Sequence, residues 1–106
     1  MSIPEITVQE LKALRDASAD FLLLDVRNPD EHALCNLGGL LIPLAELPAR
    51  LHELKQDHHT VIFCHGGGRS RRATEFLMSQ GFTNVHNLRG GITAWANEID
   101  LTMAKY

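Results

Sequence analysis

Short apolar runs alternate with amphipathic stretches along the whole chain. Four of the runs predict strands, because each is short and ends at turn-forming or polar residues, and the first is almost continuously apolar. The predicted strands are Phe21 to Val26, Leu40 to Ile42, Thr60 to Phe63 and Asn84 to Leu88.

Between these runs, apolar residues recur at helical spacing. Thr7-Val8-Gln9-Glu10 has the form of a capping box and predicts a helix from about Thr7 to Ala17. The other helical patterns are a short turn from Asp30 to Leu34, a stripe of Leu47, Leu51 and Leu54, a helix from Arg71 to Gln80, and a face formed by Ile92, Trp95 and Ile99.

This alternation of strands and helices predicts the fold class. It is typical of βαβ units, and therefore of an α/β fold with a central, mainly parallel sheet and helices on both faces. In such sheets, ligands bind beyond the carboxyl ends of the strands. Residues 100–106 show no pattern that predicts an element.

Length and composition fit one globular domain over residues 1–106. The chain is 44% hydrophobic and 22% charged, and its net charge of −3 argues against a general nucleic-acid binder. No apolar run approaches the ~20 residues that span a bilayer, and no basic-then-apolar leader is present, so we expect a cytoplasmic protein without a membrane partner.

The segment from Cys64 to Ser70 is the strongest candidate for chemistry. It places a thiol and the glycines Gly66, Gly67 and Gly68 between a predicted strand and a predicted helix. The helix dipole, the free amides of the first turn and the Arg69 guanidinium should all favour the thiolate, and the glycines let the amides turn inward around an anion. The alternative is a buried cysteine that packs as a small hydrophobe.

The arginines, histidines and cysteines indicate which kind of ligand to expect. Arg69 together with Arg71, Arg72 and Arg89 predicts a basic patch near the loop, which suits a small anionic substrate or an acidic partner. The histidines show no metal-ligand spacing with the two cysteines, so we expect neither a metal nor another cofactor. Cys35 and Cys64 do not form a C-x-x-C pair, and we expect Cys35 to be structural or incidental.

Three motifs in order resemble the rhodanese family of sulfurtransferases over nearly the whole chain. They are Leu23-Leu24-Asp25-Val26-Arg27 with Pro29 and Glu31, the loop from Cys64 to Ser70, and Asn87-Leu88-Arg89-Gly90-Gly91-Ile92 with Ala94-Trp95. The resemblance implies a rhodanese-like fold in which Cys64 carries sulfur as a persulfide. It also implies that His65, Gly66, Gly67, Gly68, Arg69 and Ser70 bind the substrate, and that Asp25 and Arg27 form a structural polar pair.

Three functions compete on this basis. The first is a sulfurtransferase that moves sulfur from an anionic donor such as thiosulfate to cyanide, a thiol or a protein cysteine. The second is a non-enzymatic sulfur-relay or binding module. The third is a cysteine phosphatase or arsenate reductase, which is disfavoured because four residues separate Cys64 from Arg69, whereas those phosphatases resemble C-x5-R and hold a larger oxyanion.

Overall fold

The computed structural model describes residues 3–106 and contains a five-stranded sheet. The strand order is β1-β5-β4-β2-β3, and every neighbouring pair is parallel. The strands are β1 (Glu5–Ile6), β2 (Leu22–Asp25), β3 (Leu40–Leu41), β4 (Thr60–Phe63) and β5 (Val85–Leu88). No described helix is long and apolar enough to cross a bilayer.

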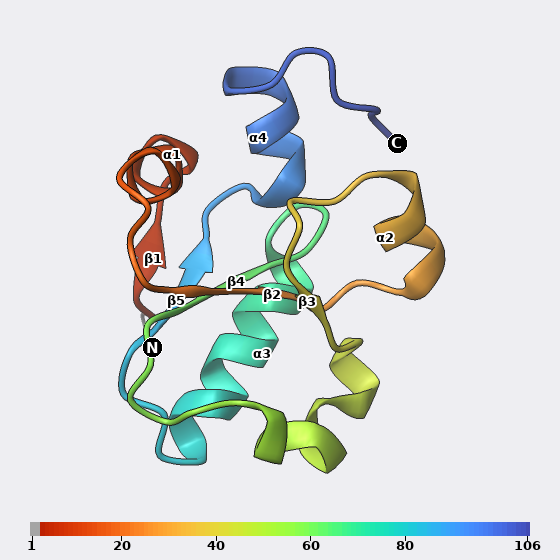
Figure 1. Cartoon of the computed structure of the whole chain (residues 1–106). Coiled ribbons are helices and arrows are strands. Elements are labelled where there is room, and N and C mark those ends of the chain that lie inside the picture. Colours follow the sequence, from red (N-terminus) through yellow and green to blue (C-terminus); the bar gives the residue numbers. More distant parts are fainter. Residues whose placement is uncertain (1–2) are drawn as a thin grey trace.

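Helices cover both faces of this sheet (Figure 1). They are α1 (Val8–Asp16), α2 (Pro29–Leu34), the 3₁₀ helix η1 (Leu44–Glu53), α3 (Gly68–Ser79) and α4 (Gly91–Glu98). Helices α1 and α4 contact each other on one side, and α3 contacts η1 on the other. The predicted α/β class is therefore confirmed.

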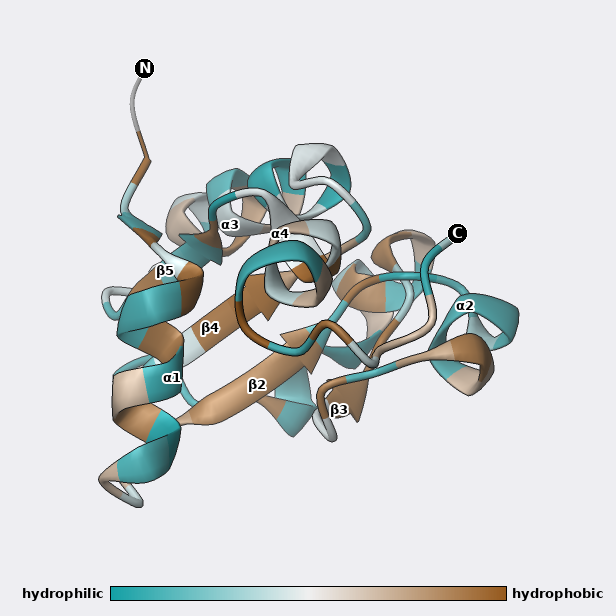
Figure 2. Cartoon of the chain, turned by 90° about the horizontal axis from the view of Figure 1, so that it is seen from above, coloured by the Kyte–Doolittle hydropathy of each residue, from teal (hydrophilic) through white to brown (hydrophobic). Residues whose placement is uncertain are grey.

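Two hydrophobic clusters lie on opposite faces of the sheet. Leu24 and Ile62 belong to the cluster beneath α3 and η1, whereas Leu23 and Val61 belong to the cluster beneath α1 and α4. Figure 2 shows β2 and β4 as hydrophobic strands at the centre. Burial on both faces explains why these strands appear in the sequence as continuous apolar runs.

The structure departs from the sequence-based elements in three places. Strand β1 was not predicted, because two residues are too few to show a period. Helix η1 is a 3₁₀ helix with a kink at Arg50, and it contains Pro48, which has no amide hydrogen to donate. Helix α3 begins at Gly68, three residues before the predicted Arg71; glycine is a poor helix former, so the sequence indicated a turn there.

The parallel register brings the carboxyl ends of the central strands together. Asp25 at the end of β2 pairs with Phe63 at the end of β4, and Cys64 directly follows Phe63. The thiol and the Asp25 carboxylate therefore share one edge of the sheet, where ligand sites of open parallel sheets occur.

Candidate active site

Cys64 lies at the junction of β4 and the loop before α3. The residue is only 1% exposed and packs within the cluster beneath α3. Its Sγ atom nevertheless has polar neighbours, because the Gly67 amide donates to Sγ at 3.1 Å and the Ser70 Oγ atom lies 3.4 Å from it. A cysteine that served only as core packing would not require these donors, so the geometry favours a reactive sulfur.

The loop turns inward at Gly67, which caps the amino end of α3. Its φ of 112° is a left-handed conformation that side chains other than glycine's rarely adopt. This turn aims the Gly67 amide at Sγ and places the sulfur beside the first turn of α3, where amides lack intrahelical acceptors. Gly66 and Gly68 have open space where a Cβ atom would be, so the backbone demands glycine only at the middle position.

Ser70 connects the sulfur to the neighbouring strand. Its fully buried hydroxyl lies within hydrogen-bond reach of three acceptors: Cys64 Sγ, the Gly67 carbonyl and Asn87 Oδ1 on β5. A hydroxyl has one proton, so Ser70 can donate to only one of them at a time. Asn87 belongs to the third sequence motif but was not predicted to be a site residue. A polar amide within a predicted buried strand is a sequence feature that could have indicated it, because buried polar groups need a partner.

The amino end of α4 binds the carbonyl groups of Cys64 and His65. The Ile92 amide donates to the Cys64 carbonyl at 2.9 Å, and the Thr93 amide donates to the His65 carbonyl at 3.1 Å. The Thr93 hydroxyl also donates to the His65 carbonyl. With these carbonyls directed toward α4, the loop amides are free to face the sulfur.

We expect Gly91→Ala to displace the loop. Gly91 has a φ of 61°, and a Cβ atom there would lie 2.6 Å from the Cys64 carbonyl oxygen and clash with that of His65. Backbone strain and overpacking should lower the free energy of unfolding by about 2–4 kcal/mol, measured by urea denaturation. Gly66→Ala is the matched control, because its Cβ atom meets open space; equal stability losses in the two variants would contradict this account.

Arg69 does not present a free guanidinium to the sulfur. Its Nη1 and Nη2 atoms donate to the two carboxylate oxygens of Glu31 on α2, at 2.6 and 2.9 Å. This bidentate contact is the main cause that lowers the pKa of Glu31 from 4.5 to about 2. Because the pKa is lowered in the folded state, the pair contributes stability above pH 4.5 that is lost as pH falls toward 2. The role of Glu31 was not predicted.

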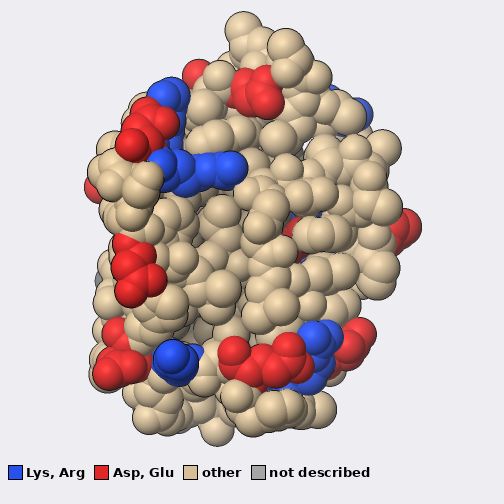
Figure 3. All heavy atoms as spheres, in the orientation of Figure 1, with Lys and Arg blue, Asp and Glu red and all other residues tan. Residues whose placement is uncertain are grey.

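The predicted basic patch is not present as an uncompensated cluster. Three of the four arginines have carboxylate partners: Arg69 as described, Arg71 with Glu75, and Arg89 with Glu5. Arg72 is exposed and forms no ion pair with the described acidic residues. On the face shown in Figure 3, basic side chains lie mostly beside acidic ones. Beside the paired Arg69 guanidinium, the backbone amides and the α3 dipole supply positive charge at the loop.

The expected polar pair of Asp25 and Arg27 is fully buried and closely hydrogen bonded. Arg27 donates through Nε, Nη2 and its own amide to the Asp25 carboxylate, at 2.8–3.0 Å. His32 Nδ1 lies 2.9 Å from the same carboxylate. Arg27 also donates to the Cys35 carbonyl through Nη2 and to the Tyr106 hydroxyl through Nη1. The pair thus ties β2 to α2 and to the end of the chain.

His65, the residue after the candidate nucleophile, lies against an aromatic ring. Tyr106 stacks on it, although the sequence showed no pattern in residues 100–106.

Both cysteines are free thiols, and Cys35 lies near Arg27. Within residues 3–106, no group of three or more His, Cys, Asp or Glu side chains is arranged to hold a metal ion.

Comparisons with known proteins identify the family of this chain. A rhodanese-like domain model matches residues 7–98. A protein named sulfurtransferase from Allochromatium vinosum is 40% identical, over 89% of each chain. A putative sulfur carrier protein, YrkF of Bacillus subtilis, is 34% identical over 93% of this chain and 54% of its own length.

Solved structures of rhodanese-related proteins have a similar fold. A rhodanese-related protein from Thermoplasma volcanium superposes with a TM-score of 0.80 and 31% identity, covering 91% of this chain and 93% of that one. The human single-domain sulfurtransferase TSTD1 gives a TM-score of 0.79 and 28% identity, covering 92% and 98%. The chain therefore belongs to the rhodanese-like domain family, and its relatives include proteins named sulfurtransferase and sulfur carrier protein.

Proposed function

We propose that this protein is a sulfurtransferase in which Cys64 carries the transferred sulfur as a persulfide. The observation on which this depends is the position of Sγ: it lies at the end of β4, with the Gly67 amide donating to it at 3.1 Å beside the amino end of α3. Such donors point at the atom that carries negative charge when sulfur acts as a nucleophile or as a persulfide. Family membership and the sulfurtransferase relative support the same chemistry.

Loading of the sulfur is a displacement at sulfur. The Cys64 thiolate attacks the outer sulfur of thiosulfate and forms a new S–S bond. The bond between the outer sulfur and the sulfonate sulfur breaks, and sulfite leaves with the electron pair. The resulting Cys64 persulfide retains one negative charge, which the amides of the loop from His65 to Ser70 stabilise.

In the unloading step, Cys64 Sγ is the leaving group and the acceptor is the nucleophile. An acceptor such as cyanide or a thiolate attacks the outer sulfur, and Sγ leaves with the electron pair as the regenerated thiolate. Cyanide becomes thiocyanate, and a thiolate becomes a persulfide. Neither half-reaction needs a metal, an external reductant or a net proton transfer, and the two steps predict ping-pong kinetics.

The state of Arg69 supports sulfur over phosphorus chemistry. In a cysteine phosphatase the loop arginine would have to hold a tetrahedral oxyanion, but here its Nη1 and Nη2 atoms are both engaged by Glu31. A persulfide places only one charged sulfur in the loop. The amides suffice for that smaller anion.

Whole-protein mass after incubation with thiosulfate tests the proposal. We expect a gain of one sulfur atom on Cys64 that disappears when cyanide is added, with thiocyanate produced in step. Repeated turnover would distinguish an enzyme from a relay module that loads only once. A protein that neither gains sulfur nor forms thiocyanate would contradict the assignment.

We expect Arg69→Ala to weaken use of thiosulfate. The variant removes a positive charge near the sulfur and frees Glu31, whose carboxylate would then repel an anionic donor. The kcat/KM for thiosulfate should fall about tenfold or more, equivalent to at least ~1.4 kcal/mol. Lys12→Ala is the charge-matched control, because Lys12 forms only an exposed ion pair with Asp16 on α1. Equal kinetics in the two variants would remove Arg69 from the site.

A further inference from the structure

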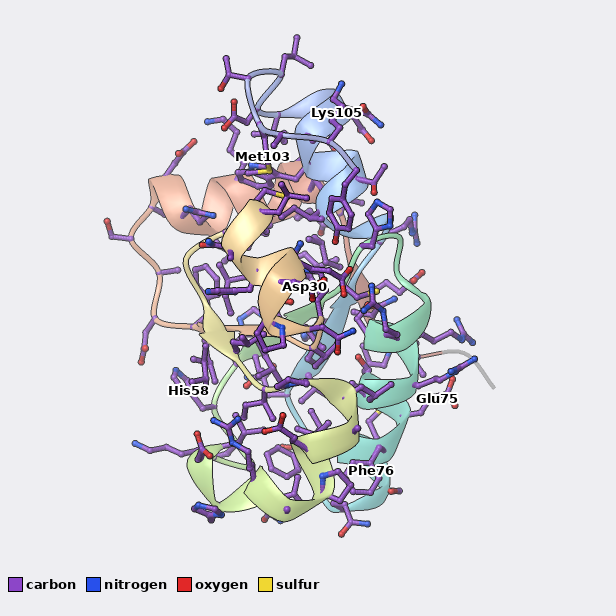
Figure 4. All side chains as sticks on the ribbon, turned by 90° about the vertical axis from the view of Figure 1, so that its right-hand side faces the viewer. Asp30, His58, Glu75, Phe76, Met103 and Lys105 are labelled. Carbon is purple, nitrogen blue, oxygen red and sulfur yellow. The ribbon has the colours of Figure 1, made fainter. Side chains whose placement is uncertain are left out.

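The segment that follows α4 returns to the loop that holds Cys64, where Tyr106 contacts His65. Figure 1 shows it running from the far end of α4 back toward α2. In Figure 4, Met103 and Lys105 lie beside α4, and Asp30 on α2 lies below them. Residues 101–106 therefore connect two elements that the sheet alone would leave apart.

The Tyr106 hydroxyl anchors this segment through two hydrogen bonds. It accepts from Arg27 Nη1 at 2.9 Å and donates to Glu31 Oε2 at 2.9 Å. Arg27 and Glu31 are themselves the partners of Asp25 and Arg69. One phenol thus joins the buried polar pair to the ion pair that holds the loop arginine, and it uses both its donor and its acceptor capacity.

The Tyr106 ring lies over the loop itself. It stacks on His65 with ring centroids 4.1 Å apart and an interplanar angle of 18°. His65 is the immediate neighbour of Cys64, and the Cys64 side chain is almost fully buried. The ring therefore covers the residue next to Cys64, while its hydroxyl bonds to Glu31 on α2.

The segment packs against the core through Met103, whereas its last three residues are exposed. Tyr106 is 42% exposed, and residues 104 and 105 are exposed as well. A cavity of about 130 Å³ separates the segment from α4 and is lined by residues that include His65, Ile92, Asn97 and Lys105. The end of the segment is thus held chiefly by the Tyr106 side chain, not by close packing on α4.

We propose that Tyr106 determines acceptor size at Cys64. With its ring stacked on His65, a small acceptor such as cyanide reaches the persulfide, whereas the cysteine of a folded protein reaches it only after Tyr106 leaves the loop. This inference rests on the proposed sulfurtransferase function. In this proposal Tyr106 limits which acceptors reach the persulfide and does not contact the reacting sulfur.

Paired transfer assays test this selectivity. The acceptors are cyanide and a reduced, folded protein with one exposed cysteine, each with thiosulfate as donor. We expect Tyr106→Ala to raise the ratio of protein-thiol to cyanide rates about tenfold, because one aromatic stack and two hydrogen bonds no longer favour the closed arrangement. Tyr106→Phe keeps the ring and should raise the ratio less. Leu101→Ala, an exposed change in the same segment, should leave it unchanged.

A second measurement is independent of sulfur transfer. In a Cys35→Ser background, Cys64 is alkylated with N-ethylmaleimide and with a polyethylene-glycol maleimide, which share one chemistry but differ in size. We expect Tyr106→Ala to accelerate the bulky reagent about tenfold relative to the small one. An unchanged alkylation ratio overturns the proposal even where the wild type transfers sulfur. A changed ratio in a protein without sulfur transfer would instead overturn the proposed function and keep the size limit.

Discussion

Cys64→Ser should abolish sulfur transfer while the fold persists. A serine hydroxyl is not ionised near neutral pH and cannot form a persulfide, so kcat should fall by at least about a thousandfold. The substitution changes one atom, and the Gly67 amide that donates to Sγ can donate to an oxygen at the same place. We therefore expect the free energy of unfolding to stay within about 1 kcal/mol of wild type. Thiocyanate production and urea denaturation measure the two effects.

Cys35→Ser is the matched control for this variant. Cys35 is a free thiol outside the loop, and its contacts with Arg27 are made mainly by its backbone carbonyl, which the substitution retains. Most activity should remain. A loss as large as that of the Cys64 variant would show that sulfur passes through both cysteines and that a single nucleophile is the wrong description.

Local features of the sequence were sufficient to predict most of the fold. The capping box at Thr7 is confirmed in both directions, with the Glu10 amide donating to Thr7 and the Thr7 amide donating to Glu10. The strands β2 and β4 were found because burial on both faces leaves continuous apolar runs. The placement of Cys64 at the carboxyl end of β4 followed from chain order alone.

The partners of the site residues could not be predicted in the same way. Glu31 and Arg69 are 38 residues apart, and Arg27 and Tyr106 are 79 apart. Their contacts exist only because the parallel sheet collects α2, the loop and the final segment at one edge. The sequence does not indicate which partner a charged side chain will have. Arg69 was expected to bind an anionic substrate, and in the structure its guanidinium is paired with the Glu31 carboxylate.

The buried pair at the end of β2 should be the most sensitive point of the fold. Asp25→Asn keeps the shape of the side chain but removes the charge that compensates Arg27, and neither side chain has any exposed surface. An uncompensated buried guanidinium costs about 3–5 kcal/mol, a large share of the ~5–15 kcal/mol that stabilises a domain of this size.

The loss should appear as a lowered urea midpoint, measured together with Asp16→Asn as control. Asp16 forms an exposed ion pair with Lys12, and breaking it should change the free energy of unfolding by about 1 kcal/mol or less. Adding Arg27→Met to Asp25→Asn should recover part of the stability, because the uncompensated charge is then gone. If Asp25→Asn is as stable as the control, or if Arg27→Met destabilises it further, the pair does not stabilise the fold through charge compensation. Its value would then lie in the hydrogen bonds by which Arg27 holds the Cys35 carbonyl and Tyr106.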